Sequence, residues 1–249
     1  MRYKCKNKSL ILIMKVIRTH DKLYLKENRY NKPKEMFKFI AKRSIKRNSV
    51  NKKICDFGCA AGEFLFYLKK IKSNNDYTGI DIRKDLLNKA KKYVPSVNFK
   101  RGSVLNKNIF KKNTFDISFL IGVHPIFDNF EKCFSNLIFW TKPEGEIFIC
   151  DMFNPDPVDV IIKYRLSKNY KKNTFETGWN IFSKESVIKF LKKNKKIKSY
   201  KFEQFFMPFH LKRQRDPVRS WTVNMNKKKI MINGLSIIQP QTLLKIKLK

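Results

Sequence analysis

A turn of small residues at 58–62 is the stretch best suited to ligand chemistry. It follows a short apolar run at 54–57 with the character of a buried strand. It precedes a segment at 63–71 whose apolar residues recur at helical spacing. Gly, Cys and Ala side chains leave the backbone open to close approach by a ligand. The N–H groups at the beginning of the next helix would point at that ligand. The pattern therefore predicts a strand–turn–helix unit that binds a small molecule.

Two common nucleotide-binding patterns fit this turn poorly. A dinucleotide fingerprint, G-x-G-x-x-G, requires glycine where the chain has Ala60 and Glu63. A phosphate-binding loop requires a Lys followed by Ser or Thr, and none follows Gly62. The remaining pattern is Asp56 two residues before Gly58, with a second glycine four residues later. A strand–helix turn that binds nothing is the alternative.

A second carboxylate lies at a suitable distance along the chain. Residues 77–82 have the character of a strand, and Asp81 stands 23 residues after Gly58. In nucleoside-binding α/β folds, an acidic residue about 20 positions after the glycine turn binds the ribose hydroxyls. We therefore expect Asp81 to bind a ribose, although a carboxylate at a strand end is by itself more often a turn residue or a helix cap.

Further strands and helices must position these groups. Apolar runs and alternation predict strands, and apolar residues three or four apart predict helices. Pro33 suits the first position of a helix, and Ser183 suits an N-cap. The expected helices are at 33–41, 63–71, 83–93, 128–142, 158–166 and 184–193. The expected strands are at 54–57, 77–82, 97–103, 113–123, 146–151, 199–207, 221–225, 229–233 and 242–248.

The segment DFGCAAGEF at 56–64 resembles the first motif of the class I, Rossmann-like S-adenosylmethionine-dependent methyltransferases. YTGIDI at 77–82 is similar to the second motif of the family. The strand at 113–123 resembles the fourth strand of the family, and KPEGEIFI at 142–149 resembles its fifth strand and the turn before it. The resemblance covers 52–151. It implies an α/β fold: a doubly wound, mostly parallel seven-stranded sheet with helices on both faces, an N-terminal helical lead-in and a C-terminal β-hairpin insertion.

The resemblance also implies S-adenosyl-L-methionine as cofactor and a set of residues that bind it. Ser103 occupies a position where the family commonly has Asp beside the adenine amine, and a hydroxyl can accept that hydrogen bond without charge assistance. Val104 would form an apolar wall beside the purine. The expected cofactor-binding residues are Asp56, Gly58, Cys59, Ala60, Gly62, Asp81, Ile82, Ser103, Val104 and Ile121.

Candidate catalytic residues follow from the same fold. Ligands in open α/β sheets bind outside the carboxyl ends of the strands, so His124, which follows the fourth strand, should face the methyl donor. A neutral imidazole suits a general base near pH 7, and Asp128 and His20 are the next candidates. A residue at the beginning of a helix, hydrogen-bonded to backbone, is the alternative for His124. We expect no metal site, because the five cysteines match no zinc spacing.

The net charge of +36 predicts weak, non-specific binding to polyanions at low salt. Only 11 of the 56 basic residues are Arg, the residue that nucleic-acid sites favour. The tetrapeptide of DNA amino-methyltransferases is absent after the fourth strand. We therefore expect a small molecule or sugar-linked metabolite as methyl acceptor. The alternatives are an RNA or ribosomal-protein methyltransferase and a non-catalytic partner subunit that binds the cofactor.

The sequence is expected to form a lead-in or lid at 1–50 and a methyltransferase domain at 51–249, with the inserted hairpin at about 208–240. The apolar run at 10–14 is too short for a signal peptide core or a membrane span. We therefore expect a cytoplasmic protein with reduced cysteines. Translation could begin at Met1 or Met14, and the oligomeric state is open.

Overall fold

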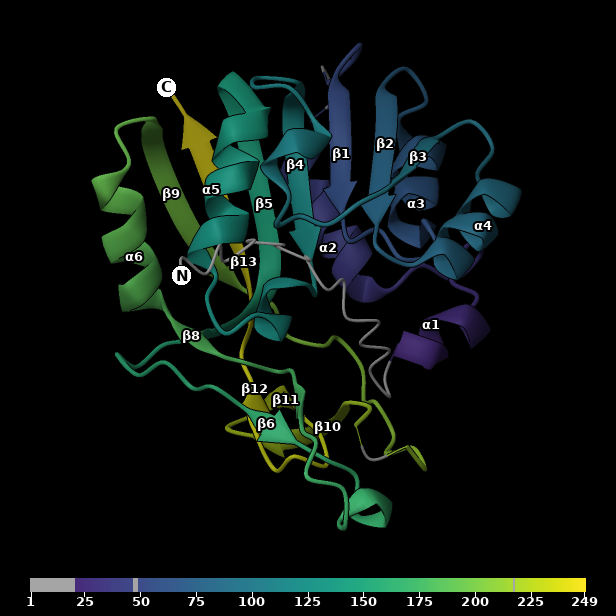
Figure 1. Ribbon diagram of the computed structural model, residues 1–249, viewed down its shortest axis with the longest axis vertical. Coiled ribbons are helices and arrows are strands. Elements are labelled where there is room, and N and C mark those ends of the chain that lie inside the picture. Colours follow the sequence, from purple (N-terminus) through teal and green to yellow (C-terminus); the bar gives the residue numbers. More distant parts are fainter. Residues whose placement is uncertain (1–20, 47–48, 217) are drawn as a thin grey trace, which may run out of the picture.

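A central sheet organises the computed structural model, which describes residues 21–46, 49–216 and 218–249. Seven strands follow one another in the order β3-β2-β1-β4-β5-β13-β9 (Figure 1). All neighbours are parallel except β13, which is antiparallel to both β5 and β9. The predicted mostly parallel, doubly wound sheet is confirmed. The strands are β1 Lys53–Phe57, β2 Asp76–Asp81, β3 Asn98–Arg101, β4 Phe115–Ile121, β5 Thr141–Asn154, β9 Ile197–Gln204 and β13 Gln241–Leu248.

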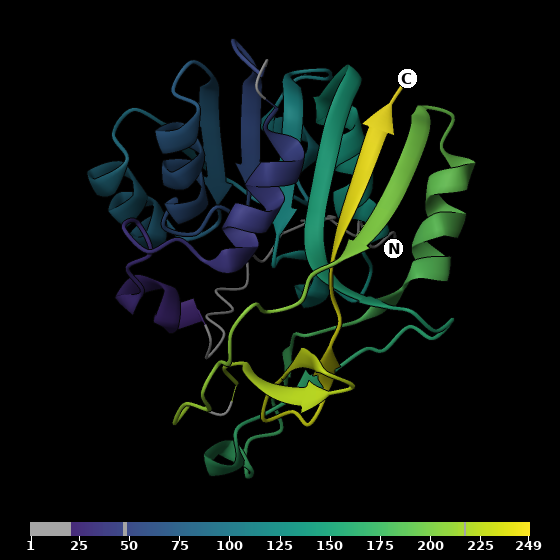
Figure 2. The ribbon, with the colours of Figure 1, turned by 180° about the vertical axis from the view of Figure 1, so that it is seen from behind.

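Helices cover both faces of the sheet (Figures 1 and 2). Side chains alternate along each strand, so neighbouring residues enter different cores. Phe57 packs with the helix residues of one cluster, which contains Phe134 and Val187, whereas Ile54 packs with the other, which contains Ile40 and Leu65. The first face carries α5 Glu131–Trp140 and α6 Lys184–Lys193, and the second carries α2 Glu35–Ser44, α3 Glu63–Ile71 and α4 Lys84–Tyr93.

A smaller lobe lies beyond the carboxyl ends of β1, β4 and β5 (Figure 1). Its larger part is the predicted insertion between β9 and β13, where Asn226 and Lys227 form the hairpin turn with positive φ. Helix α1 Asp21–Lys26 lies near the same edge. The short strands of the lobe are β6 Lys163–Tyr164, β7 Glu176–Thr177, β10 Trp221–Met225, β11 Lys228–Ile232 and β12 Ile238–Gln239; β8 Phe182–Ser183 pairs with the end of β5.

The prediction of a helix at 158–166 is wrong. Val160 instead forms an antiparallel bridge with Ile181, and the Asn180 side chain accepts a hydrogen bond from the Ile162 N–H at 2.8 Å. These partners take the backbone groups that a helix would use, and no core receives the exposed side chain of Val158. Ile71, the last residue of α3, is also exposed.

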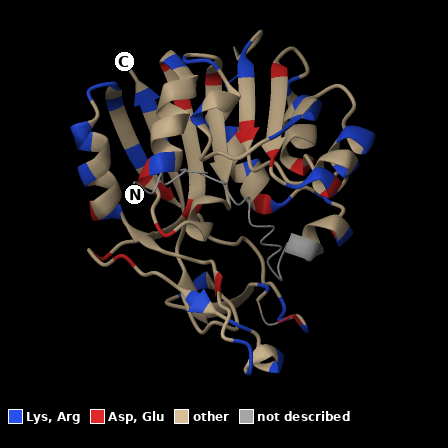
Figure 3. Cartoon of the chain, in the orientation of Figure 1, with Lys and Arg blue, Asp and Glu red and all other residues tan. Residues whose placement is uncertain are grey.

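Lys and Arg residues are spread over several elements, including α4, α6 and the smaller lobe (Figure 3). No helix in the described ranges is long and apolar enough to cross a membrane. The four described cysteines, Cys55, Cys59, Cys133 and Cys150, are free thiols, as expected. Cys5 lies outside the described residues.

Candidate active site

The glycine turn after β1 is fixed to the end of β2. The N–H groups of Gly58 and Cys59 both donate to the carbonyl of Ile80, at 2.8 and 2.9 Å. Gly58 has φ +85°, and a Cβ there would lie 2.4 Å from Cγ2 of Val123. Only glycine satisfies both the dihedral angle and the space. The turn therefore leaves an open cradle where a ligand can approach the backbone.

Asp81 connects the turn to the beginning of the next helix. Its Oδ2 accepts a hydrogen bond from the Ala60 N–H at 2.9 Å, and its Oδ1 accepts one from the Arg83 N–H at 2.9 Å. These two bonds orient the carboxylate. Asp81 lines the cavity described below, so it can receive a pair of adjacent hydroxyl groups.

Asp56, at the end of β1, has very different surroundings. Its side chain is buried, and Oδ1 has no hydrogen-bond partner among the described residues. Burial, and to a lesser degree the nearby charge of Asp81, raises the pKa of Asp56 to about 8. A buried polar atom without a partner is costly, and Asp56 lines the cavity. It is therefore suited to a ligand that supplies a donor or a positive charge.

One cavity of about 870 Å³ contains most of the predicted cofactor site. It lies where the strand order reverses between β1 and β4, the position at which open α/β sheets bind ligands. Gly62 does not line it; with φ +75° it is the N-cap of α3. The predicted residues that do line it are Asp56, Gly58, Cys59, Ala60, Asp81, Ile82, Ser103, Val104 and Ile121.

The residues after β2 and β3 form one wall of this cavity. Ile82 is 53% exposed although it is a large apolar side chain, which suits it to cover a flat, apolar ligand surface. The Ser103 hydroxyl accepts a hydrogen bond from the Leu105 N–H at 3.2 Å. Val104 is buried beside it. An open turn, an oriented Asp81, an apolar wall and an Asp56 oxygen with no hydrogen bond to the described residues together fit a nucleoside that carries a positive charge.

The lead-in and the inserted lobe close over the cavity and contact each other. Glu27 forms ion pairs with Lys34 at 2.9 Å and with Arg219 at 2.9 Å. Burial would raise the pKa of Glu27, but the charges of Lys34 and Arg219 outweigh it and lower that pKa. Tyr30 donates to the carbonyl of Ala61 at 2.7 Å. The roof is therefore joined both to the glycine turn and across the cavity.

His124 does not point into the cavity, contrary to the prediction. Its ring is fully buried and packs against Phe134, Phe153 and Phe182, with the Phe153 centroid at 4.9 Å. Strand β4 ends at Ile121, and a 3₁₀ turn follows at His124–Ile126. Val123 and Pro125, on either side of His124, line the cavity, but His124 does not. The geometry offers no direct contact between this imidazole and a methyl donor.

The other two catalytic candidates also gain no support from the geometry. Asp128 lies outside the cavity lining, half exposed, and pairs with Lys163 at 3.0 Å. His20 lies outside the described residues. The roles of all three residues in catalysis therefore stay predictions. Within the described ranges no group of three or more His, Cys, Asp or Glu residues could hold a metal ion.

Comparison with known proteins identifies the family. A family model described as a methyltransferase domain matches residues 48–204, more than half of the chain. The chain belongs to this methyltransferase family. The predicted class is thereby confirmed. A relative named "Putative methyltransferase 235L", from Invertebrate iridescent virus 6, is 33% identical over 69 residues. This match spans 28% of the present chain and only 26% of the length of that relative.

Solved structures show the same fold for this methyltransferase. The YcgJ protein from Bacillus subtilis superimposes with a TM-score of 0.59 at 15% identity, covering 86% of this chain and 99% of that one. An S-adenosylmethionine-dependent methyltransferase from Mesorhizobium loti has a TM-score of 0.50 at 11% identity, covering 66% and 83%. At such identities the likeness establishes the Rossmann-like architecture alone.

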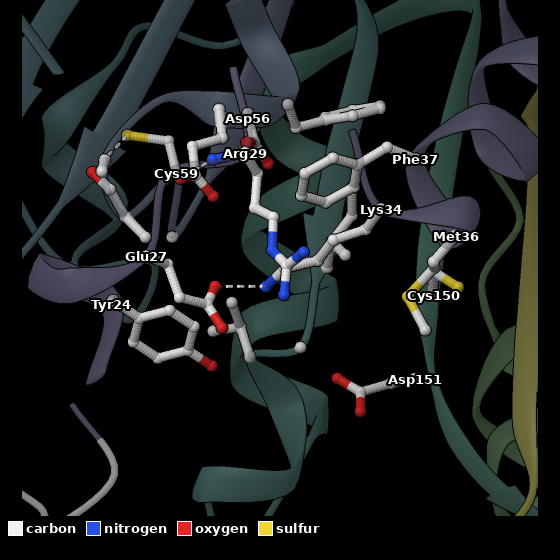
Figure 4. Close-up of a pocket in the computed structure, with 18 of the residues that line it drawn as sticks. Tyr24, Glu27, Arg29, Lys34, Met36, Phe37, Asp56, Cys59, Cys150 and Asp151 are labelled. Atoms are coloured by element: carbon white, nitrogen blue, oxygen red, sulfur yellow. Dashed lines mark hydrogen bonds and ion pairs between the residues drawn. The ribbon is translucent and has the colours of Figure 1, made fainter. Parts of the chain in front are cut away.

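The sequence did not single out several residues that line the methyltransferase cavity. Asp151, near the end of β5, is one of them, and its buried carboxylate projects into the cavity (Figure 4). The rule that favoured His124, its place after a strand at the carboxyl edge, applies equally to Asp151. The lobe adds an apolar set that no local pattern indicates: Trp179, Met207, Phe209, Leu211 and Met231.

Proposed function

We propose that the protein transfers the methyl group of S-adenosylmethionine to a small organic acceptor or sugar-linked metabolite. The observation that carries the proposal is the roofed cavity of about 870 Å³. Small-molecule pockets span roughly 300–1,000 Å³, so this one is large enough for a nucleoside cofactor and a modest acceptor together. The Glu27 ion pairs hold the roof in place above it, which favours an enclosed ligand over a macromolecular surface.

The residues divide the cavity into two halves. Asp81 would bind the ribose hydroxyls, and Asp56 would pair with the positive charge of the cofactor. The cofactor supplies a methyl group already activated by its sulfonium. The chain must then orient the acceptor for in-line attack and exclude water, and positioning of this kind supplies much of the rate in a group transfer. The half beyond β4, lined by β5 and the lobe, would hold the acceptor.

An RNA or ribosomal-protein acceptor is the competing proposal, supported by the net charge of +36. A protein that binds the cofactor without turnover is the third. Neither explains why two separate additions close one cavity.

Methyl-labelled S-adenosylmethionine tests the proposal directly. The purified protein is incubated with the small-molecule fraction of a cell extract, with total RNA and with ribosomal proteins. We expect label in the small-molecule fraction, and the Asp81→Ala variant serves as the cofactor-binding control. Label in RNA or ribosomal protein alone would replace the proposed acceptor class. Donor binding without transfer to any pool would favour the non-catalytic subunit.

A further inference from the structure

Two buried side chains, Asp151 at the wall of the cavity and His124 behind it, contain polar atoms without a hydrogen bond to the described residues. Asp151 is 4% exposed; its Oδ1 accepts from the Met152 N–H at 3.1 Å, but Oδ2 has no hydrogen bond among the described residues. His124 is 0% exposed, and neither ring nitrogen has a hydrogen bond there. The two groups face each other, with Nδ1 of His124 3.4 Å from Oδ2 of Asp151.

Packing alone does not account for this pair. The slot between Phe134, Phe153 and Phe182 is aromatic and would accept a phenyl ring without the cost of burying two ring nitrogens. Asp151 likewise buries a carboxylate oxygen without a bond. Leaving a buried donor or acceptor unpaired is unfavourable, because the group loses its hydrogen bonds to water and gains none in the protein. Polar atoms that are buried beside a cavity at such a cost indicate a bound ligand that supplies the missing hydrogen bonds.

The position of Asp151 associates it with the acceptor. Asp56 and Asp81 lie at the ends of β1 and β2, on the glycine-turn side of the switch point, whereas Asp151 lies on β5, across β4. Figure 4 shows Asp151 on the side of the cavity opposite Tyr24 and Glu27. The apolar residues of the lobe line the same cavity: Trp179, Met207, Phe209, Leu211 and Met231.

We infer that Asp151 is a catalytic residue that binds and deprotonates the acceptor, and that His124 positions it. The inference rests on the proposed function and deepens it. The acceptor class is a molecule with a hydroxyl or neutral N–H group on a largely apolar body. When the acceptor binds, the Nδ1–H of His124 donates to Asp151 Oδ2 and fixes the carboxylate. The 3.4 Å between these two atoms is long for a hydrogen bond. Hydrogen bonds between catalytic groups are often this long before the substrate binds.

The proton and electron balance of the step is complete. A lone pair of the acceptor oxygen or nitrogen forms the bond to the methyl carbon. The carbon–sulfur bond breaks and its electron pair stays on sulfur, which gives S-adenosylhomocysteine. The acceptor proton passes to Oδ2 of Asp151 and then to water. No metal, oxidant or further reactant is needed.

The isosteric variant Asp151→Asn tests the catalytic residue. It removes the proton acceptor and keeps the shape, so kcat for label transfer to the small-molecule fraction should fall by about 10²–10⁴-fold. The KM for S-adenosylmethionine and the calorimetric affinity for S-adenosylhomocysteine should not change, because the donor lies on the other side of the switch point. Glu185→Gln, an exposed acid on α6 paired with Lys189, is the matched control.

Two variants of His124 separate positioning from packing. His124→Phe fills the aromatic slot without a donor, and His124→Gln supplies an amide donor. If the ring only packs, Phe preserves kcat; if it positions Asp151, Phe lowers kcat and Gln retains more of it. Nitrogen-15 NMR of histidine-labelled protein gives a readout that needs no acceptor. We expect an Nδ1–H tautomer for His124 whose signal shifts in Asp151→Asn.

Each outcome has one meaning. Unchanged kcat in Asp151→Asn, or an Nε2–H tautomer of His124, overturns this inference and leaves the proposed function intact. A wild-type protein that labels no small molecule overturns both, and the calorimetry then shows whether donor binding survives.

Discussion

At the scale of single residues, the two carboxyl groups beside the glycine turn, Asp56 and Asp81, differ because their surroundings differ. Asp81 accepts two backbone N–H groups, which orient it and stabilise its charge. Asp56 is buried with one oxygen unpartnered among the described residues, and its pKa is raised to about 8. The same residue type therefore presents an oriented acceptor at the end of β2 and a buried carboxyl group with a raised pKa at the end of β1.

Asp81→Ala should weaken the binding of S-adenosylhomocysteine by roughly 1–3 kcal/mol, since the ribose hydroxyls would lose their acceptor. Calorimetry measures this directly. Asp81→Asn is the matched control, because its single carbonyl oxygen retains part of the acceptor capacity; its loss should be smaller. An unchanged affinity in a folded Asp81→Ala protein would contradict the assignment.

Asp56 should make stability fall as pH rises. Its pKa is about 8 in the folded protein against an ordinary value of 3.8, so between these values the folded state binds more protons than the unfolded chain. The free energy of unfolding therefore decreases with pH across this window. Urea unfolding of wild type and Asp56→Asn at several pH values isolates the effect. The variant should show a flatter profile; parallel profiles would show that Asp56 does not titrate there.

Local patterns predicted part of this site. Asp56, Gly58 and Asp81 were predicted because they lie in two short segments whose spacing indicates a strand–turn–helix unit and the next strand end, and which resemble the motifs of the family. His124 was placed at the correct edge of the sheet but facing the wrong way. A shift of one position along the 3₁₀ turn would change whether the His124 side chain enters the cavity or the core. Aromatic residues on α5, β5 and β8, distant in sequence, hold it in the core.

At the scale of elements, a predicted helix formed where its apolar side chains had a continuous core to pack against. The helix predicted at 128–142 forms at 131–140, because its apolar spacing matches a stripe that the sheet buries, including Cys133 and Leu137. The segment at 158–166 has similar apolar content but lies over the lobe. There Asn180 and Ile181 bind its backbone groups, a long-range contact that no local pattern encodes.

The turn after β1 should tolerate no side chain at Gly58. Gly58 and Gly122 both have positive φ, +85° and +67°, but only at Gly58 would a Cβ collide, at 2.4 Å from Val123. Gly122→Ala should cost about 1–2 kcal/mol of unfolding free energy for the backbone alone. Gly58→Ala should cost more and should also weaken binding of S-adenosylhomocysteine. Urea unfolding compares the two, and equal losses would show that Val123 yields without cost.

At the scale of the whole molecule, the charge of +36 is spread over many elements (Figure 3). Lysine side chains on separate surfaces attract a polyanion without forming a shaped site. RNA binding should therefore be weak, indifferent to sequence and lost between low and physiological salt. Fluorescence anisotropy with two unrelated RNAs over a salt series measures this. A salt-resistant preference for one RNA would instead support the RNA-methyltransferase alternative.

The place of β13 in the sheet has a consequence for biosynthesis. Among the described strands β9 pairs only with β13, which lies between it and β5 although residues 205–240 separate the two in sequence. Chains leave the ribosome N-terminal end first, so β9 and the lobe that roofs the cavity emerge before the strand that attaches β9 to the sheet. During that interval β5 presents an open edge, and such edges pair readily with other chains. We therefore expect the nascent protein to depend on chaperones until residues 241–248 have been translated.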